Sequence, residues 1–224
     1  MKVVLAILRP FIFLTSRLLF RIRFIDAENV PAAGACIITP NHITYADPIW
    51  VTIPIHRPVH YMTWDKVFEI PGLGFIARLF GAFPVKLEGT DTAAQREAVE
   101  LLRQGKPLMI FPEGGRTRTG RVMPFKMGAF RLALTQGVSI IPVTIEGAWQ
   151  IWPAHKLLPR PGRLTIRYFP AIQVEAVPDE VGNAELKLRA RELAKKTHDI
   201  VAGSALAASG GEVTEQVVPL ERSI

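Results

Sequence analysis

At residues 107–116 the chain reads PLMIFPEGGR, an apolar run of strand length that ends in a glycine-rich turn. In open α/β sheets, ligands bind beyond the carboxyl ends of the strands. Glycine at such a turn lets backbone N–H groups approach an anion closely, and arginine can hold a phosphate through two parallel hydrogen bonds. The turn is followed by the positive charges of Arg116, Arg118, Arg121 and Lys126. The segment therefore predicts an anion site; taken alone, it could also be a solvated basic turn.

A second polar segment lies at residues 41–47, which read NHITYAD. A neutral imidazole such as that of His42, with an unperturbed pKa of about 6.5, can take a proton from a hydroxyl. Asp47 could orient this ring and stabilise the imidazolium. A spacing of five residues does not align two side chains on one helix face. We therefore expect His42 in a loop and Asp47 as the N-cap of a helix that begins at Pro48.

Two other interpretations of residues 41–47 stay open at this point. Asp47 could only cap the helix while His42 fills a buried loop. The two side chains could also belong to a metal site, although no third ligand lies nearby in the sequence.

These segments and later ones occur in the order and spacing of a known family. Asn41, His42 and Asp47 match an Asn-His-x4-Asp block, and residues 111–117 match a Phe-Pro-Glu-Gly-x-Arg-[Ser/Thr] block. Further matches are Gly120-Arg121, Pro124-Phe125-Lys126, Gly128-Ala129 and the proline-interrupted apolar run at 140–143. Across residues 20–175 the chain resembles the glycerolipid acyltransferases typified by bacterial 1-acylglycerol-3-phosphate acyltransferase of the PlsC type.

The resemblance implies an O-acyltransferase in which His42 is the general base and Asp47 is its partner. The hydroxyl of 1-acylglycerol-3-phosphate would attack an acyl thioester directly and give phosphatidic acid. The donor would be acyl-CoA or acyl carrier protein, with no cofactor and no metal. Two alternatives remain: another acceptor (glycerol-3-phosphate, another lysophospholipid or a lyso-ornithine lipid), or a non-catalytic peripheral lipid-binding protein.

The resemblance also implies an acceptor site. Glu113, Gly114 and Gly115 would belong to it, with Glu113 contacting glycerol hydroxyls or holding Arg116. Arg116 and, by its position, Lys86 would bind the acceptor phosphate. The family usually has arginine at the position of Lys86 and often threonine at that of Gly115. Lysine keeps the charge but loses the planar fork, so the acceptor is less sharply defined than the reaction.

Composition favours a membrane surface as the partner. Hydrophobic residues make up 49% of the chain and the formal net charge is +7, a combination that suits nucleic acid or an anionic membrane. We recognise no nucleic-acid-binding motif and expect no nucleic acid partner. The sequence indicates no oligomeric state.

The N-terminal segment sharpens the membrane prediction. Residues 1–24 are rich in Leu, Ile, Val and Phe, but basic residues leave no uninterrupted span of bilayer length. On a helix, these basic residues fall within roughly 160° of one face: Lys2, Arg9, Arg17, Arg21 and Arg23. We therefore expect an interfacial amphipathic helix on the cytoplasmic face of a membrane, with its basic residues toward lipid headgroups. The alternative is a helix that packs on the core and has a solvated basic side.

The remaining pattern predicts an α/β fold with a mixed sheet flanked by helices. We expect the acyltransferase domain at 25–202 and a disordered tail at 203–224. Strands are expected at 35–39, 107–111, 139–145 and 163–169, and helices at 92–104, 125–136 and 184–201. Cys36, the only cysteine, lies in the first of these strands, and we expect it to pack in the core rather than carry an acyl group.

Overall fold

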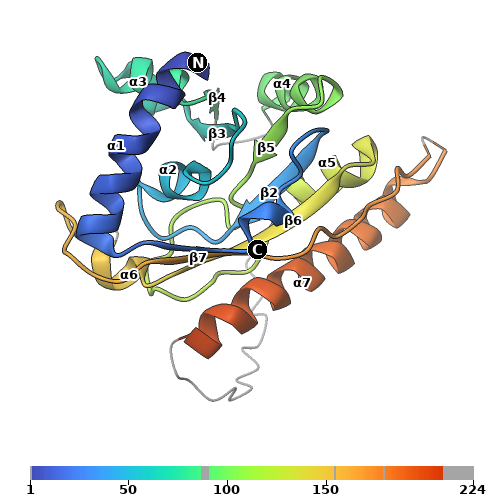
Figure 1. Ribbon diagram of the computed structural model, residues 1–224. Coiled ribbons are helices and arrows are strands. Elements are labelled where there is room, and N and C mark those ends of the chain that lie inside the picture. Colours follow the sequence, from blue (N-terminus) through green and yellow to red (C-terminus); the bar gives the residue numbers. More distant parts are fainter. Residues whose placement is uncertain (1, 87–90, 154, 179, 209–224) are drawn as a thin grey trace.

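The computed structural model describes residues 2–86, 91–153, 155–178 and 180–208, with side chains from residue 10 onward. A seven-stranded sheet runs through the molecule in the order β1-β7-β6-β2-β5-β3-β4 (Figure 1). Its strands are β1 (Arg23–Ile25), β2 (Cys36–Pro40), β3 (His60–Trp64), β4 (Ala82–Val85), β5 (Pro107–Met109), β6 (Ser139–Glu146) and β7 (Thr165–Tyr168). Strands β2 to β6 are mutually parallel, while β7 is antiparallel to β6 and parallel to β1. The sheet is mixed, as predicted.

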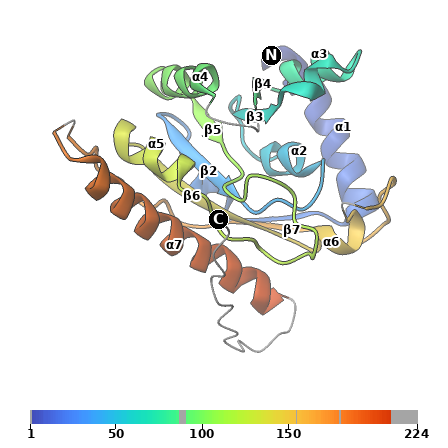
Figure 2. The ribbon, with the colours of Figure 1, turned by 180° about the vertical axis from the view of Figure 1, so that it is seen from behind.

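Helices cover both faces of the sheet (Figures 1 and 2). They are α1 (Lys2–Phe20), α2 (Asp47–Thr52), α3 (Leu73–Leu79), α4 (Thr92–Arg103), α5 (Gly128–Gln136), α6 (Ala148–Ile151) and α7 (Asn183–Ala208), with short 3-10 turns η1 (Ala27–Asn29) and η2 (Asp65–Glu69). In β2, Cys36 and Ile38 join one core cluster with Trp50 of α2, whereas Ile37 joins the other with Phe130 of α5. Alternate residues of the strand thus serve opposite faces, which is why the central strands read as unbroken apolar runs.

The predicted helix boundaries in the middle of the chain are close to those observed. Helix α4 begins after Asp91, whose carboxylate accepts the N–H of Ala94 as an N-cap. Helix α5 begins at Gly128, three residues later than predicted, and ends at Gln136, followed by Gly137 in the left-handed conformation. Three strands, β1, β3 and β4, were not predicted.

Both ends of the described chain differ from the prediction. Helix α1 ends at Phe20, Arg21 has a φ of 43°, and Arg23 already lies in β1. The last two of the five basic residues therefore do not belong to the helix face on which the sequence analysis placed them. At the other end, α7 continues through Ala208, so residues 203–208 are helical and not a disordered tail. Residues 209–224 of the expected tail lie outside the described residues.

Two further features bear on the predicted chemistry. Burial leaves Cys36 with no exposed surface and raises the pKa of its thiol to about 11, which agrees with a packing role. Among the described residues, no helix combines the length and apolar character needed to cross a bilayer.

Candidate active site

The predicted base and its partner are in contact at the carboxyl end of β2. His42 Nδ1 lies 2.9 Å from Asp47 Oδ2. The Asp47 carboxylate is fully buried and also accepts the N–H groups of Ile43 and Thr44 and the hydroxyl of Thr44, at 2.6, 2.8 and 2.7 Å. A carboxylate accepts only, so Nδ1 of a neutral His42 carries the proton and Nε2 keeps a lone pair. The His42 side chain is 18% exposed, so the ring remains open to a substrate.

Asp47 does not act as the N-cap that the sequence suggested. The cap position belongs to Ala46, and Asp47 is the first residue of α2, followed by Pro48. Its carboxylate turns back to the preceding loop instead of the following amides of its own helix. The interpretation in which Asp47 only caps a helix therefore does not describe this loop.

Asn41 fixes the point at which the loop leaves the sheet. Its side-chain amide donates to the carbonyl of Ile145 at 3.1 Å and accepts the N–H of the same residue at 2.7 Å. The amide thus pairs with β6 as a backbone group of one more β2 residue would. Sequence reasoning noted Asn41 only as part of a motif; an Asn between a buried strand and a candidate base was the available signal.

The two sequence segments meet through backbone groups of His42. Its N–H donates to Glu113 Oε1 at 2.6 Å, and its carbonyl accepts the N–H of Thr117 at 2.8 Å. Its ring stacks on Phe111, with 4.0 Å between centroids and 26° between planes. Strands β2 and β5 are adjacent and parallel, so their carboxyl ends bring together residues 71 positions apart.

Glu113 is buried and connects two backbone segments through hydrogen bonds. Its second oxygen, Oε2, accepts the N–H of Met123 at 2.9 Å, so each carboxylate oxygen accepts one backbone N–H. Burial raises the pKa of Glu113 to about 7, although the two N–H groups oppose that shift. Within the described part of the chain, the hydrogen bonds of Glu113 go to the backbone and not to Arg116.

Arg116 lies beside the His42 loop at residues 41–47 and has unused hydrogen-bonding capacity among the described residues. Its guanidinium carbon is 3.5 Å from the ring centroid of Tyr45, a cation–π contact. Its Nη1 atom is buried and has no hydrogen-bond partner among the described residues. A buried, unpaired guanidinium nitrogen is costly, and an anionic substrate group would satisfy it.

In the glycine turn next to Arg116, the side chain of Lys126 packs closely against Gly114. Gly114 has a φ of +72°, and a Cβ there would lie 2.5 Å from Lys126 Nζ. The main chain of Lys126 is held by a bond from its N–H to the carbonyl of Pro112 at 2.8 Å. Gly115 is exposed and has open space around its Cα. The turn therefore combines two cations with a backbone that a substrate can approach.

Lys86 lies farther away than the other predicted residues. It follows the carboxyl end of β4, on the side of the sheet where His42 follows β2. Its N–H donates to Asp91 Oδ2 at 2.9 Å, and its side chain is exposed. Strands β5 and β3 separate β4 from β2, which corresponds to roughly 14 Å at the usual strand spacing. The structure thus brings His42, Asp47, Glu113, Gly114, Gly115 and Arg116 together and leaves Lys86 apart.

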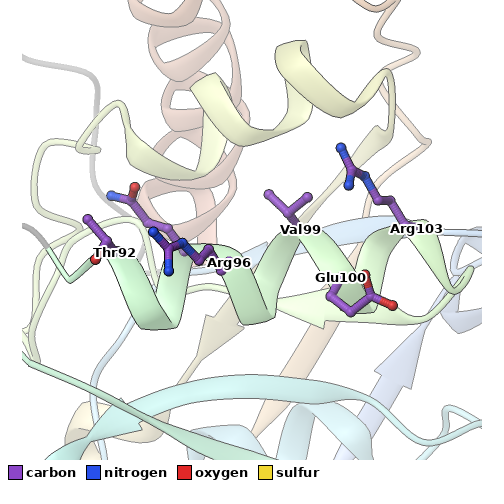
Figure 3. A pocket seen from close by; sticks show the side chains of 6 residues that line it. Thr92, Arg96, Val99, Glu100 and Arg103 are labelled. Carbon is purple, nitrogen blue, oxygen red and sulfur yellow. The ribbon is translucent and has the colours of Figure 1, made fainter.

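Other features of the described residues lie away from this site. A hollow of about 580 Å³ runs along one face of α4, lined by Thr92, Gln95, Arg96, Val99, Glu100 and Arg103 (Figure 3). None of the predicted site residues lines it. No cluster of three or more His, Cys, Asp or Glu side chains placed to hold a metal occurs in the described parts of the chain.

Fold and site together define an α/β protein with a carboxylate-oriented histidine at the carboxyl end of a central strand. Residues 21–146, more than half of the chain, match the Acyltransferase family model, and the chain belongs to that family. The resemblance stated from the motifs is thereby confirmed.

Particular relatives are 1-acyl-sn-glycerol-3-phosphate acyltransferases. The chain is 30% identical over 129 residues to the chloroplastic enzyme BAT2 of Brassica napus, covering 56% of this chain and 37% of that protein. It is 33% identical over 121 residues to the enzyme of Borreliella burgdorferi, covering 53% and 48%. Each match thus spans less than half of the relative. The crystal structure of the 1-acyl-sn-glycerophosphate (LPA) acyltransferase PlsC from Thermotoga maritima has the same fold, with a TM-score of 0.68, 24% identity, and coverage of 86% of this chain and 74% of that one.

Proposed function

We propose that this protein transfers a fatty acyl group from an acyl thioester to the free hydroxyl of 1-acylglycerol-3-phosphate and so forms phosphatidic acid. The observation that carries the proposal is the contact between His42 Nδ1 and Asp47 Oδ2. Beside it lies Arg116, with a buried nitrogen that has no hydrogen-bond partner in the described chain. The names of the relatives support the same acceptor.

The proposed reaction needs no acyl-enzyme. The acceptor hydroxyl lies against Nε2 of His42, which takes its proton as the oxygen attacks the thioester carbonyl. Asp47 stabilises the imidazolium that forms. The tetrahedral intermediate then collapses, the C–S bond breaks, and the imidazolium returns its proton to the leaving thiolate. Cys36 takes no part, since it is fully buried and its pKa is raised to about 11.

The proposed acceptor site is the turn at residues 113–116. Arg116 binds the phosphate, while Gly114 and Gly115 let the glycerol backbone come close to the main chain. Glu113 contributes by holding His42 to this turn. Lys86 assists only through a phosphate or headgroup large enough to approach β4, because it lies three strand positions from β2.

The proposed partners follow from this chemistry. The acyl donor is acyl-CoA or acyl carrier protein, no cofactor takes part, and the enzyme works at the cytoplasmic face of a membrane that holds its lipid acceptor.

The test is release of free thiol from acyl-CoA or acyl carrier protein by the purified protein in detergent. Lysophosphatidic acid, glycerol-3-phosphate, a lyso-ornithine lipid and monoacylglycerol are compared as acceptors, with His42→Ala as the control. Release that depends on lysophosphatidic acid and on His42 supports the proposal. Equal rates with monoacylglycerol contradict the role of Arg116, and no release with any acceptor favours a lipid-binding protein.

A further inference from the structure

Large apolar side chains are exposed mainly on one side of this molecule. Among the described residues, fourteen large apolar side chains are exposed. Ten of them come from α1, from α3 and Ile70 just before it, and from the loop between α6 and β7. They are Phe11, Leu14, Leu18, Leu19, Ile70, Leu73, Phe75, Ile76, Leu157 and Leu158. Figure 1 shows these three segments at the left of the molecule, and Figure 2 shows them at the right after the half turn.

Helix α1 is apolar on two opposite faces within its described half. Phe13 packs against the core and Phe20 is buried. Phe11, Leu14 and Leu18, spaced at i, i+3 and i+7, point away from the core and are 66%, 54% and 71% exposed. A helix that only packs on a core has polar residues on its outer face, so the outer face of α1 needs another occupant.

Helix α3 presents a similar face from a rigid support. Phe75 is 71% exposed and Ile76 is 48% exposed. Between Leu73 and Phe75, Gly74 is buried so closely on η2 that a Cβ would lie 2.7 Å from the Phe68 carbonyl oxygen. This close packing holds the short helix in place, so the exposure of its apolar side chains is built into the fold.

The three segments carry a positive rim. Exposed basic residues lie in or next to each segment: Arg17 in α1 and Arg21 just after it, Arg78 in α3 and Lys66 in the preceding turn η2, and Lys156 and Arg160 in the loop. The exposed acid Glu69 also lies in η2. Three of these cations also lie over an aromatic ring, with Arg17, Lys66 and Arg78 at 6.0, 5.2 and 4.6 Å from the centroids of Phe13, Trp64 and Phe68. An apolar surface rimmed by cations is complementary to an anionic lipid bilayer.

We propose that α1, α3 with Ile70, and the loop at 155–160 form one lipid-facing surface that docks on an anionic bilayer. The inference rests on the proposed function, which requires a lipid acceptor, and adds two segments to the N-terminal helix. A second copy of the chain fits this surface poorly, because two positive rims would face each other across the contact.

This surface continues into the candidate active site. The Trp152 indole N–H donates to the carbonyl of Lys156 at 2.9 Å. The Trp152 ring packs against the ring of Tyr45, with 6.4 Å between centroids. The guanidinium of Arg116 lies over the other partner, the Tyr45 ring. On the other side, Phe20 of α1 contacts Trp50 of α2 at 5.3 Å between centroids. Docking would therefore place the acceptor site and the His42 loop beside the lipid headgroups.

The test is flotation with vesicles of phosphatidylglycerol and phosphatidylcholine. Two double variants, Phe75→Ser with Ile76→Ser and Leu157→Ser with Leu158→Ser, remove exposed apolar surface outside α1. The matched control, Leu188→Ser with Leu206→Ser, alters exposed leucines of α7. Each test variant should bind about tenfold more weakly, and the control should bind as wild type does. Wild type should bind phosphatidylcholine vesicles less than anionic ones.

Activity distinguishes this inference from the proposed function. With a short-chain lysophosphatidic acid kept monomeric, both test variants should keep wild-type turnover. If wild type shows no turnover, the vesicle-binding result still tests whether this surface binds lipid. Vesicle binding by both test variants equal to that of wild type would overturn the proposal. So would a wild-type dimer that the Phe75 variant converts to monomers without loss of vesicle binding.

Discussion

The His42 loop at residues 41–47 and the turn at residues 113–116 lie side by side but differ in how their polar groups are satisfied. In the loop, the buried Asp47 carboxylate has four donors and the amide of Asn41 is paired twice. In the turn, Arg116 keeps a buried nitrogen without a partner in the described residues. We expect the first region to be complete without substrate and the second to be completed by one. Substitutions in the loop should therefore affect catalysis or stability, and those in the turn should mainly affect acceptor binding.

His42→Ala should give the largest effect. Loss of a general base costs about 10²–10⁴-fold in turnover. The backbone bonds of residue 42 to Glu113 and Thr117 do not need the imidazole, so the midpoint of thermal unfolding should stay near that of wild type. His56→Ala removes an exposed imidazole elsewhere and should leave turnover unchanged. Near wild-type turnover of folded His42→Ala would assign the base to another group.

Asp47→Asn should lower stability as well as turnover. The amide nitrogen of asparagine cannot accept a hydrogen bond, so it would leave buried donors of the loop unpaired. The free energy of unfolding in urea should fall by about 1–3 kcal/mol. Asp65→Asn is the matched control, since among the described residues Asp65 accepts the N–H of Lys66 alone, at an exposed site. Equal stability of the two variants would mean that the loop rearranges at little cost.

Arg116→Ala should weaken acceptor binding without destabilising the fold. A charge-assisted hydrogen bond is worth about 1.5–3 kcal/mol, so the KM for lysophosphatidic acid should rise about 10- to 100-fold. The KM for the acyl thioester should change little. Arg118→Ala, which removes an exposed cation from the same loop, should have a weaker effect. A clear loss of stability in Arg116→Ala would show that the turn, like the loop, is complete without substrate.

Glu113 links the two regions and makes their contact depend on pH. Its pKa rises from an ordinary 4.5 to about 7 in the fold, so the folded state binds the proton more tightly. The stability of wild type relative to Glu113→Gln should be highest below pH 4.5 and should fall as the pH rises through 7. Urea unfolding of both proteins across this range measures the difference. A constant difference would mean that the two N–H donors cancel the effect of burial.

Gly114→Ala and Gly115→Ala should give the smallest effects and differ from each other. At Gly114 the positive φ and the neighbouring Lys126 side chain make a Cβ unfavourable, with an expected cost of about 1 kcal/mol or more in unfolding free energy. Gly115 has open space and no positive φ, so alanine should be tolerated. Identical unfolding midpoints for the two variants would remove the steric account of the turn.

The features of this site that could be predicted were those that depend on residues close together in the sequence. A histidine and an aspartate five residues apart left a capping role and a metal site open, and the resemblance of the motifs to the acyltransferases selected an oriented base. The partners of Glu113 could not be predicted, because they are backbone N–H groups of His42 and Met123, and every residue except proline has one. The distance of Lys86 depends on strand order, which local patterns do not encode.

The same distinction explains the fold. The central strands β2, β5 and β6 are buried on both faces, so their apolar runs were visible in the sequence. Strand β3 mixes buried Tyr61 with partly exposed and polar neighbours, and β1 has only three residues. Neither gives a clear period of two, so neither was predicted. The helix at 92–103 was predicted because Asp91 and Gly105 mark its limits locally.

The pairing of Asn41 with Ile145 has a consequence for the dynamics of the base. The Ile145 N–H is held inside the central sheet by a side chain that immediately precedes His42. Its hydrogen exchange should therefore be as slow as that of the strand amides around it, and should require opening of the β2–β6 pair. We therefore expect the start of the His42 loop to open only together with the central sheet.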